Sequence, residues 1–382
     1  MPLNTLDKSN AASTQTRTDL HETDCSQLIA EHFPLESVIQ FLEKRVRPAA
    51  SQLDVQSDQL FEMFTAAGAQ SLLTPKLPTD WGGSELSGNA YQQLQMLFAT
   101  HSGALTFLLA QHQSAASFIL ASENEALKTE YLPAMTTGDK RIGVGFSHLR
   151  RQTPPAIARR TKDGYVLSGE IPWVTGSGLF SEFVGAAQLP SGEAIFGLLP
   201  LTNAAGITIS QPMAMAGMAA TSTVRVTLNN WVLSDEKVMG LRPAGWLGTR
   251  DRINPLSPMG MILGCAAGAC RILSEALKRR TIALDLPERL HQIRMQLSHE
   301  LTTVSTLPTQ NYDQKIALRG RAIAHMNQCA QAAMVASGGA ANALHHPARR
   351  IYGEALVFSV SGQTNDGAVS TLEAIHAISA GQ

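Results

Sequence analysis

The chain is poor in several features that define whole classes of protein. Its cysteines are only Cys25, Cys265, Cys270 and Cys329, and they form no CxxC pair and no metal-ligand spacing with histidine. We therefore expect reduced, mostly buried thiols in a cytoplasmic protein, and no metal site. No run of eighteen apolar residues occurs, so we expect no membrane span. The formal net charge is −1, which argues against the basic face of a nucleic-acid-binding protein.

Two nucleotide-binding signatures are also missing. No GxGxxG stands between a strand and a helix, and no GxxxxGK[ST] is present, so neither a Rossmann domain nor a P-loop is indicated. The N-terminus lacks the apolar core of a secretory signal. Residues 1–33 are polar and rich in Ser, Thr and Asn, and we expect them to be a disordered leader.

The remaining sequence changes its hydrophobic period twice. Hydrophobic residues make up 44% of the chain, enough for a sizeable core. Residues 34–140 have helical spacing, residues 141–240 read as short strands separated by turn residues, and helical spacing returns from about residue 254 within the expected bundle domain of residues 241–382. Because helices and strands are segregated and not alternating, the predicted fold class is α+β.

Histidines in the helical regions have ordinary structural interpretations. His112 lies on an otherwise apolar helix and is expected to be a hydrogen-bonded core residue. His345 and His346 have no carboxylate or cysteine at ligand spacing, so we expect a capping or surface pair and not a metal site.

Six motifs occur in a fixed order along the chain. They are "DWGG" (80–83), "ALKTEYLPAMTTGDKRIGVGFSH" (126–148), "LSGEIPWVTG" (167–176), "MAGMAATSTVRVTLNNWVLSDEKVMG" (215–240), "LKRRTIA" (277–283) and "VASGGAANALHHPARRIYGEALVFSVSGQT" (335–364). In this order the set resembles the acyl-CoA dehydrogenase superfamily, over roughly residues 35–375. The resemblance implies an N-terminal helical domain, a middle β-barrel-like domain and a C-terminal four-helix bundle.

The resemblance also implies FAD, bound between the middle domain and the bundle of a homodimer or homotetramer. Trp173 resembles the tryptophan that lies along the isoalloxazine ring, and Thr175 the threonine that faces the flavin N5 region. Ser147 stands where a hydroxyl contacts the flavin pyrimidine. An aromatic wall with a few fixed donors suits a flavin. The alternative for Trp173 is an ordinary core residue of the β domain.

Three further residues match positions that contact the dinucleotide tail, and a fourth, Thr364, matches a threonine of a family motif. Arg279 matches an arginine that reaches the diphosphate of the neighbouring subunit, which suits a guanidinium. Gly338 and Gly339 match a double glycine that the neighbouring adenosine approaches. A solvated helix-end charge for Arg279 and a helix C-cap for the glycines are the alternatives.

The position of the catalytic base departs from the family's pattern. Removing the α-proton of an acyl thioester needs a carboxylate, and the residue aligned with the usual Glu is Gly362. A minority of the family carries the base on the first helix of the bundle. That position falls at Ile253 and Asn254, which again provide no carboxylate. The nearest acids, Asp251 and Glu354, are candidates for a displaced base, with surface or ion-pair roles as the alternative.

These matches to the family's motifs, together with the missing base, leave three functional hypotheses. The first is a flavin-dependent oxidoreductase acting on an acyl-CoA, an acyl-carrier thioester or a related small substrate. The second is a flavin monooxygenase, which uses reduced flavin and oxygen and needs no such base. The third is a non-catalytic, flavin-free scaffold or partner subunit. Because the motifs that contact the dinucleotide tail depart from the family's pattern, FAD, FMN and loss of flavin all remain open.

Overall fold

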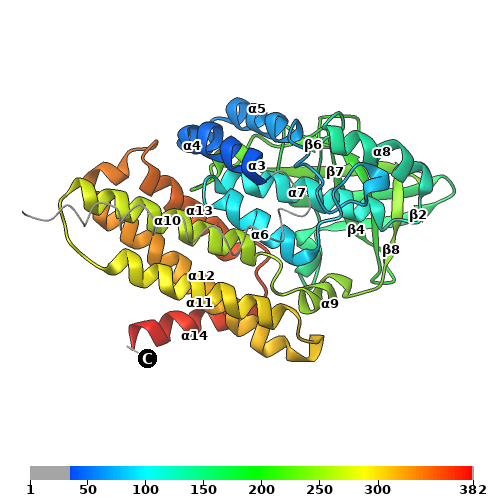
Figure 1. Cartoon of the computed structure of the whole chain (residues 1–382). Coiled ribbons are helices and arrows are strands. Elements are labelled where there is room, and N and C mark those ends of the chain that lie inside the picture. The colour runs from blue at the N-terminus through cyan, green and yellow to red at the C-terminus, as the bar shows by residue number, and fades with distance from the viewer. Residues whose placement is uncertain (1–34, 381–382) are drawn as a thin grey trace, which may run out of the picture.

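The structure is a computed structural model that describes residues 35–380. The predicted leader (1–33) and Cys25 lie outside the described residues. Three groups of elements follow one another: helices, an eight-stranded sheet, and helices again. The predicted α+β class is confirmed. Figure 1 shows α6 and α7 between the C-terminal bundle and the sheet.

The N-terminal helices are delimited by side-chain caps and left-handed glycine. Ser87, Ser102 and Asn124 each accept a hydrogen bond from a backbone N–H in the first turn of a helix. Gly138, at φ 87°, ends the last of these helices. The helices are α3 (Leu35–Phe41), η1 (Leu42–Val46), α4 (Arg47–Leu53), α5 (Ser57–Gly68), α6 (Gly88–Ala99), α7 (Gly103–Leu120) and α8 (Glu125–Thr137).

The middle sheet has the strand order β6-β7-β3-β2-β4-β5-β8, and β1 pairs with β4. Most pairs are antiparallel, whereas β1 and β2 each pair with β4 in parallel. β6 and β8 are the two ends of this path, and they pair with β7 and β5 and not with each other. The sheet is therefore not the closed barrel expected. The strands are β1 (Ile142–Gly145), β2 (Ala156–Thr161), β3 (Gly164–Val174), β4 (Glu182–Gln188), β5 (Ala194–Pro200), β6 (Ile207–Ile209), β7 (Val224–Ser234) and β8 (Val238–Arg242).

The C-terminal region begins with the short α9. Four long helices, α10 to α13, then form a bundle, and α14 packs on it. Two of its helices, α9 and α14, were not predicted. The helices are α9 (Trp246–Ile253), α10 (Met259–Arg279), α11 (Leu286–Ser305), α12 (Tyr312–Ser337), α13 (Pro347–Val360) and α14 (Asn365–Ser379). By length and composition α10 would suffice to cross a membrane, but 78% of its apolar window is buried inside the protein. It is the core helix of the bundle.

The tight contact between α10 and α6 depends on glycine. Gly260, Gly264 and Gly268 recur at every fourth position of α10 and so lie on one face. A Cβ at these positions would lie 2.3, 2.3 and 2.7 Å from carbonyl oxygens of α6 and the residue after it. The absence of side chains therefore lets the two backbones touch. This contact fixes the relative position of two helices that both line the site below.

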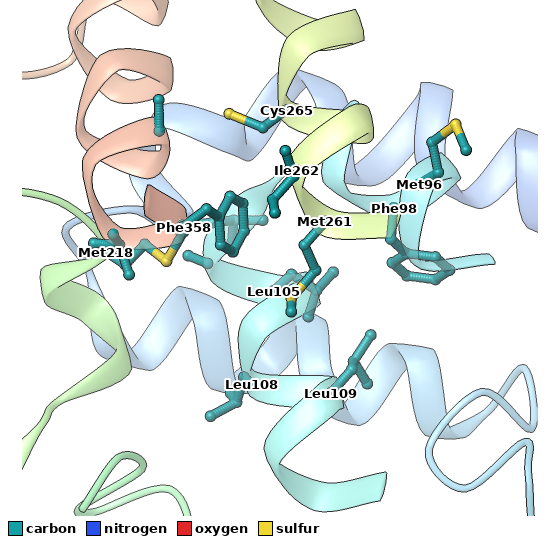
Figure 2. Close-up of a cluster of buried hydrophobic side chains, with 14 of the residues drawn as sticks. Met96, Phe98, Leu105, Leu108, Leu109, Met218, Met261, Ile262, Cys265 and Phe358 are labelled. Atoms are coloured by element: carbon teal, nitrogen blue, oxygen red, sulfur yellow. The ribbon is translucent and has the colours of Figure 1, made fainter. Parts of the chain in front are cut away.

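Apolar side chains from four helices meet behind that site. Figure 2 shows side chains of α6, α7, α10 and α13 gathered with Met218, which comes from the segment between β6 and β7. Met218 and Met261 belong both to this buried cluster and to the lining of the site. The core thus supports one wall of the site directly.

Candidate functional site

A cleft of about 1040 Å³ lies where the sheet, α6, α7 and the bundle meet. Seven of the residues singled out from the sequence line it together: Ser147, Trp173, Thr175, Asp251, Ile253, Asn254 and Gly362. They come from sequence positions more than 200 residues apart. The fold therefore brings the predicted ring-binding residues and the predicted base position to one cavity.

The aromatic wall is formed at the end of β3. Trp173 is 48% exposed, whereas the next residue, Val174, is fully buried, as the alternation of a strand requires. The alternative of an ordinary core tryptophan is therefore wrong. Thr175 follows, and its Oγ1 lies 3.2 Å from Oγ1 of Thr223. A half-exposed indole beside buried hydroxyls suits a flat, partly polar ligand.

The segment after β1 also lines the cleft. Ser147 is exposed there and begins a short 3-10 turn. His148 is 2% exposed, and its Nε2 lies 3.1 Å from the carbonyl oxygen of Ala186. Burial lowers the pKa of His148 to about 4, so the imidazole is neutral at pH 7. Its Nδ1 is buried without a hydrogen-bond partner among residues 35–380.

At the predicted position of the base, Gly362, a buried arginine holds the backbone. Gly362 has φ 60°, a conformation that a glutamate would adopt only with strain. Arg319 is 4% exposed and donates from Nη2 to the carbonyl oxygens of Ser361 and Gly362, both at 3.2 Å. It also donates from Nη1 to Pro255 O at 3.3 Å. A guanidinium, and not a carboxylate, is therefore the charged group next to this position.

Asp251 faces the cleft but is engaged in an ion pair. Arg150 donates to its two oxygens from Nε at 2.7 Å and from Nη2 at 2.9 Å. This bidentate geometry is the strong form of an arginine–carboxylate contact. The ion-pair interpretation of Asp251 is confirmed, and a role as base would require this pair to open.

Glu354 lies outside the lining of the cleft and is completely buried. Its Oε1 accepts hydrogen bonds from Gly103 N at 2.9 Å and from Arg350 Nη1 at 2.6 Å. Burial raises the pKa of Glu354 to about 7, and the nearby Arg350 opposes that rise. The carboxylate thus caps the N-terminus of α7 and neutralises a buried guanidinium, which confirms the ion-pair interpretation.

The residues predicted for the dinucleotide tail do not line the cleft of this chain. Arg279 is exposed at the end of α10, and Gly338 and Gly339 follow α12 at the same end of the bundle. Gly338 is the C-cap of α12, with φ 67°. Thr364 caps α14 by accepting a hydrogen bond from Gly367 N at 3.2 Å.

The two histidine predictions are confirmed. His112 is fully buried, with Nδ1 3.2 Å from Ile142 O and Nε2 3.0 Å from Met135 O. Burial lowers its pKa to about 4. His346 caps α13, its Nδ1 accepting from Ala348 N at 3.1 Å.

Cysteine and metal-ligand arrangements offer no second site within residues 35–380. Cys265, Cys270 and Cys329 are free and buried, and the Sγ atoms of Cys270 and Cys329 lie 3.6 Å apart. Among these described residues no group of three or more potential ligands is placed to hold a metal.

Sequence reasoning missed the 213–223 segment as a positioned wall. Asp54, on the N-terminal side, is 1% exposed and accepts a hydrogen bond from Met218 N at 2.7 Å. Arg349 donates to the other oxygen of Asp54 at 3.0 Å. Gly217 packs on α13, where its Cβ would lie 2.4 Å from Gly353 backbone. The signals in the sequence were the small-residue run "AMAGMAAT" and the start of the motif at 215–240.

Sequence reasoning also missed most of the positive charges of the cleft. Lys315 and Arg319 lie one turn apart on α12 and are both buried, and Arg250 lies on the unpredicted α9. Three cations within the otherwise apolar run "KIALRGRAIA" were the available signal, because buried charges are uncommon without a partner.

Three comparisons relate this chain to known proteins. Residues 31–139 match the family described as acyl-CoA dehydrogenase, N-terminal domain. A 3-(aryl)acrylate reductase of Clostridium sporogenes is 20% identical over 245 residues, which cover 62% of this chain and 64% of that protein. The match thus spans less than two thirds of that relative's length.

Solved structures share the whole fold. Glutaryl-CoA dehydrogenase from Mycobacterium smegmatis superposes with a TM-score of 0.73 at 17% identity, covering 94% of this chain and 95% of that one. The same enzyme has been solved in complex with FADH2. An acyl-CoA dehydrogenase from Geobacillus kaustophilus gives a TM-score of 0.72 at 13% identity, covering 88% and 96% of the two chains.

Proposed function

We propose that the chain is a flavin-dependent oxidoreductase of the acyl-CoA dehydrogenase superfamily, acting on an acyl thioester or a related small substrate. The observation that carries the proposal is the cleft in which Trp173, Thr175 and Ser147 lie together. Oxidoreductase neighbours and a relative named as an acrylate reductase support it.

The residues present fit the ring of a flavin. The exposed indole of Trp173 provides a flat apolar wall, and the hydroxyls of Thr175 and Ser147 provide polar contacts. His148 adds a buried, unpartnered acceptor on the same cleft. When bound, a flavin would supply hydride transfer. The chain's own part is to hold the ring, exclude water and place the substrate beside it.

FAD is the proposed cofactor, with FMN or loss of flavin as alternatives. Arg279, Gly338 and Gly339 lie at one end of the bundle, away from the cleft lining, so within one chain they do not extend the ring site. They would serve an FAD tail only in a homodimer or homotetramer, which we propose as the assembly. The free, buried thiols are consistent with the proposed cytoplasmic location.

The direction of electron flow is a separate part of the proposal. Asp251 is the only carboxylate among the residues that line the cleft, and it is paired with Arg150. Oxidation of a thioester would need Asp251 or Glu354 to be released from its guanidinium. Reduction of a conjugated C=C bond, which the name of the C. sporogenes relative describes, adds a hydride to the β-carbon and a proton to the α-carbon. It therefore needs a proton source at the α-carbon, which solvent water can supply, and not a free carboxylate base.

The same observation favours one second candidate, a flavin monooxygenase on this fold. A reaction of reduced flavin with oxygen requires no carboxylate to remove an α-proton, so the Arg319-supported loop at Gly362 does not obstruct it. The third hypothesis, a flavin-free scaffold, predicts a protein that binds no flavin.

Spectroscopy of the purified protein separates these possibilities. The proposal predicts that it takes up FAD or FMN and that Trp173→Ala weakens uptake at least tenfold, whereas Trp231→Ala, elsewhere on the sheet, does not. Anaerobic bleaching by acyl-CoAs supports dehydrogenation. Reoxidation of the photoreduced flavin by enoyl thioesters or acrylates supports reduction, and oxygen-dependent product formation with a flavin reductase marks the monooxygenase. Failure to take up either flavin would exclude all but the scaffold.

A further inference from the structure

The charges of the cleft are strongly unbalanced. Its lining includes one carboxylate, Asp251, and six cationic side chains: Lys76, Arg150, Arg151, Arg250, Lys315 and Arg319. The whole chain has a net charge of −1, so this excess of positive charge is local. Clefts lined by one sign of charge attract ligands of the opposite sign.

Three of the six cations already have protein partners. Arg150 is paired with Asp251, and Arg319 donates to carbonyl oxygens around Gly362. Lys315 donates to Leu307 O at 2.6 Å. These groups shape the site, and their donors are largely committed.

Arg250 differs because its guanidinium is fixed in place but not hydrogen-bonded within residues 35–380. It lies 4.9 Å from the centre of the Phe118 ring and 5.6 Å from that of the Trp246 ring. These contacts orient the planar fork without using its N–H donors. Burial lowers the pKa of Arg250; the charge of Asp251 opposes this shift and that of Arg150 adds to it, so the charge of Arg250 is only partly compensated.

The location of Arg250 relates it to the reacting end of the cleft. The paired charges of Asp251 and Arg150 lie close enough to Arg250 to act on its pKa, and they also act on the pKa of Arg319. Arg319 in turn contacts Gly362. Gly362 is the position at which the family resemblance places the base, and hence the carbons next to the substrate's carbonyl group. An anion bound by Arg250 would lie at this end, where a free acid carries its carboxylate.

We propose that Arg250 binds a carboxylate of the substrate, so that this protein acts on a free acid. The inference rests on the proposed function, because it names the substrate class of the same cleft. The planar, preorganised guanidinium offers two parallel N–H donors to a carboxylate. The apolar part of the substrate would lie against Phe107 and Leu356, which also line the cleft.

Calorimetric titration with a matched pair of probes tests this. The purified protein, with whatever flavin it holds, is titrated with 3-phenylpropionate and with its uncharged amide, 3-phenylpropionamide. We expect the carboxylate to bind at least tenfold more tightly than the amide. Arg250→Gln should remove that preference, and Arg250→Lys should keep the preference at lower affinity.

Arg252→Gln is the control variant. Arg252 lies on the same helix, 61% exposed and paired with Asp366, and does not line the cleft. Equal affinity for acid and amide in the unsubstituted protein, or an unchanged preference in Arg250→Gln, would overturn the proposal. Inorganic phosphate is titrated in parallel, and binding that is tighter than that of the carboxylate and lost in Arg250→Gln would assign the site to a phosphate instead.

Flavin content, measured on the same preparations, separates the two proposals. A protein that takes up flavin but does not distinguish acid from amide contradicts only the carboxylate site. A protein that takes up neither FAD nor FMN contradicts the proposed function, while the titrations still decide whether Arg250 binds a carboxylate.

Discussion

At the scale of single residues, guanidinium groups organise the surroundings of the cleft. Arg319 holds the backbone at Gly362, Arg350 neutralises Glu354, and Arg150 holds Asp251. Asp251 and Glu354, the two carboxylates proposed from the sequence as a displaced base, are therefore both paired with a guanidinium. Such pairs contribute through geometry as much as energy, because desolvation offsets much of the Coulombic attraction.

Glu354→Gln is predicted to destabilise the fold. The substitution leaves the Arg350 guanidinium buried without its counter-charge, which should lower the free energy of unfolding by about 3 kcal/mol. Glu125→Gln, which removes an exposed partner of Lys128, should change it by less than about 1 kcal/mol. Urea denaturation measures both. A Glu354→Gln variant that unfolds like the unsubstituted protein but has lost turnover would instead make Glu354 the base.

Buried histidine predicts acid sensitivity in a defined pH range. The pKa of His112 falls from 6.5 to about 4 because the ring is buried. As pH falls from about 6.5 to about 4, the unfolded chain takes up a proton that the folded ring does not. Stability present above pH 6.5 is therefore lost across this range, by about 3 kcal/mol for this one residue.

The variant His112→Gln isolates that contribution. It should be less stable at pH 7 because two backbone contacts are disturbed, but its stability should fall less steeply between pH 6.5 and 4. His376→Gln, at an exposed position of α14, should retain the slope of the unsubstituted protein. An identical slope in His112→Gln would show that the ring is protonated in the folded protein.

At the scale of elements, close backbone contacts set the walls of the cleft. α6 and α10 touch through Gly260, Gly264 and Gly268, and the 213–223 segment touches α13 through Gly217. Met218 and Ser222, in that segment, have φ 54° and 48°, and such left-handed residues cost roughly 1 kcal/mol or more each. The strained segment is held by Asp54 from outside the cleft.

Gly264→Ala tests the contact between α6 and α10. The added Cβ would lie 2.3 Å from Met96 O and 2.8 Å from the Ala99 Cβ, so the helices must separate. We expect a loss of about 1–3 kcal/mol, despite the higher helix propensity of alanine. Gly248→Ala, in α9 with no atom within 4 Å of the new Cβ, should gain roughly 0.5–1 kcal/mol. Equal unfolding midpoints for the two variants would contradict the tight contact.

The elements of the site were predictable to different degrees. The spacing of hydrophobic residues was enough to predict the long helices and most strands, because each of these elements buries one side over several turns or pleats. The short α9 and the strained 213–223 segment were not foreseen, since contacts distant in sequence hold them. Arg250 and Asp54 owe their positions to these segments, so local pattern could not assign them a role. Trp173 was found because a tryptophan between proline and a turn is unusual.

At the scale of the whole molecule, one helix leaves an apolar face uncovered in a single chain. Val369, Leu372, Ile375 and Ile378 of α14 are 43–66% exposed and recur at every third residue, so they form a stripe that winds across about half of the helix surface. An apolar stripe of this kind commonly marks a contact with another chain. It supports the proposed homodimer or homotetramer.

Leu372→Gln is predicted to weaken self-association. The substitution places an amide in the middle of the stripe and should shift the protein toward smaller species in sedimentation velocity. Glu373→Gln introduces the same side chain at the neighbouring exposed position and should leave the distribution unchanged. A monomeric unsubstituted protein, or equal distributions for both variants, would exclude α14 as the contact.

The absorption spectrum of the purified protein, followed by extraction of its cofactor, tests the central claim most directly. The account predicts the visible bands of an oxidised flavin, released on denaturation, together with loss of those bands in Trp173→Ala while its far-UV circular dichroism is unchanged. A colourless protein that takes up neither FAD nor FMN at micromolar concentration would contradict it.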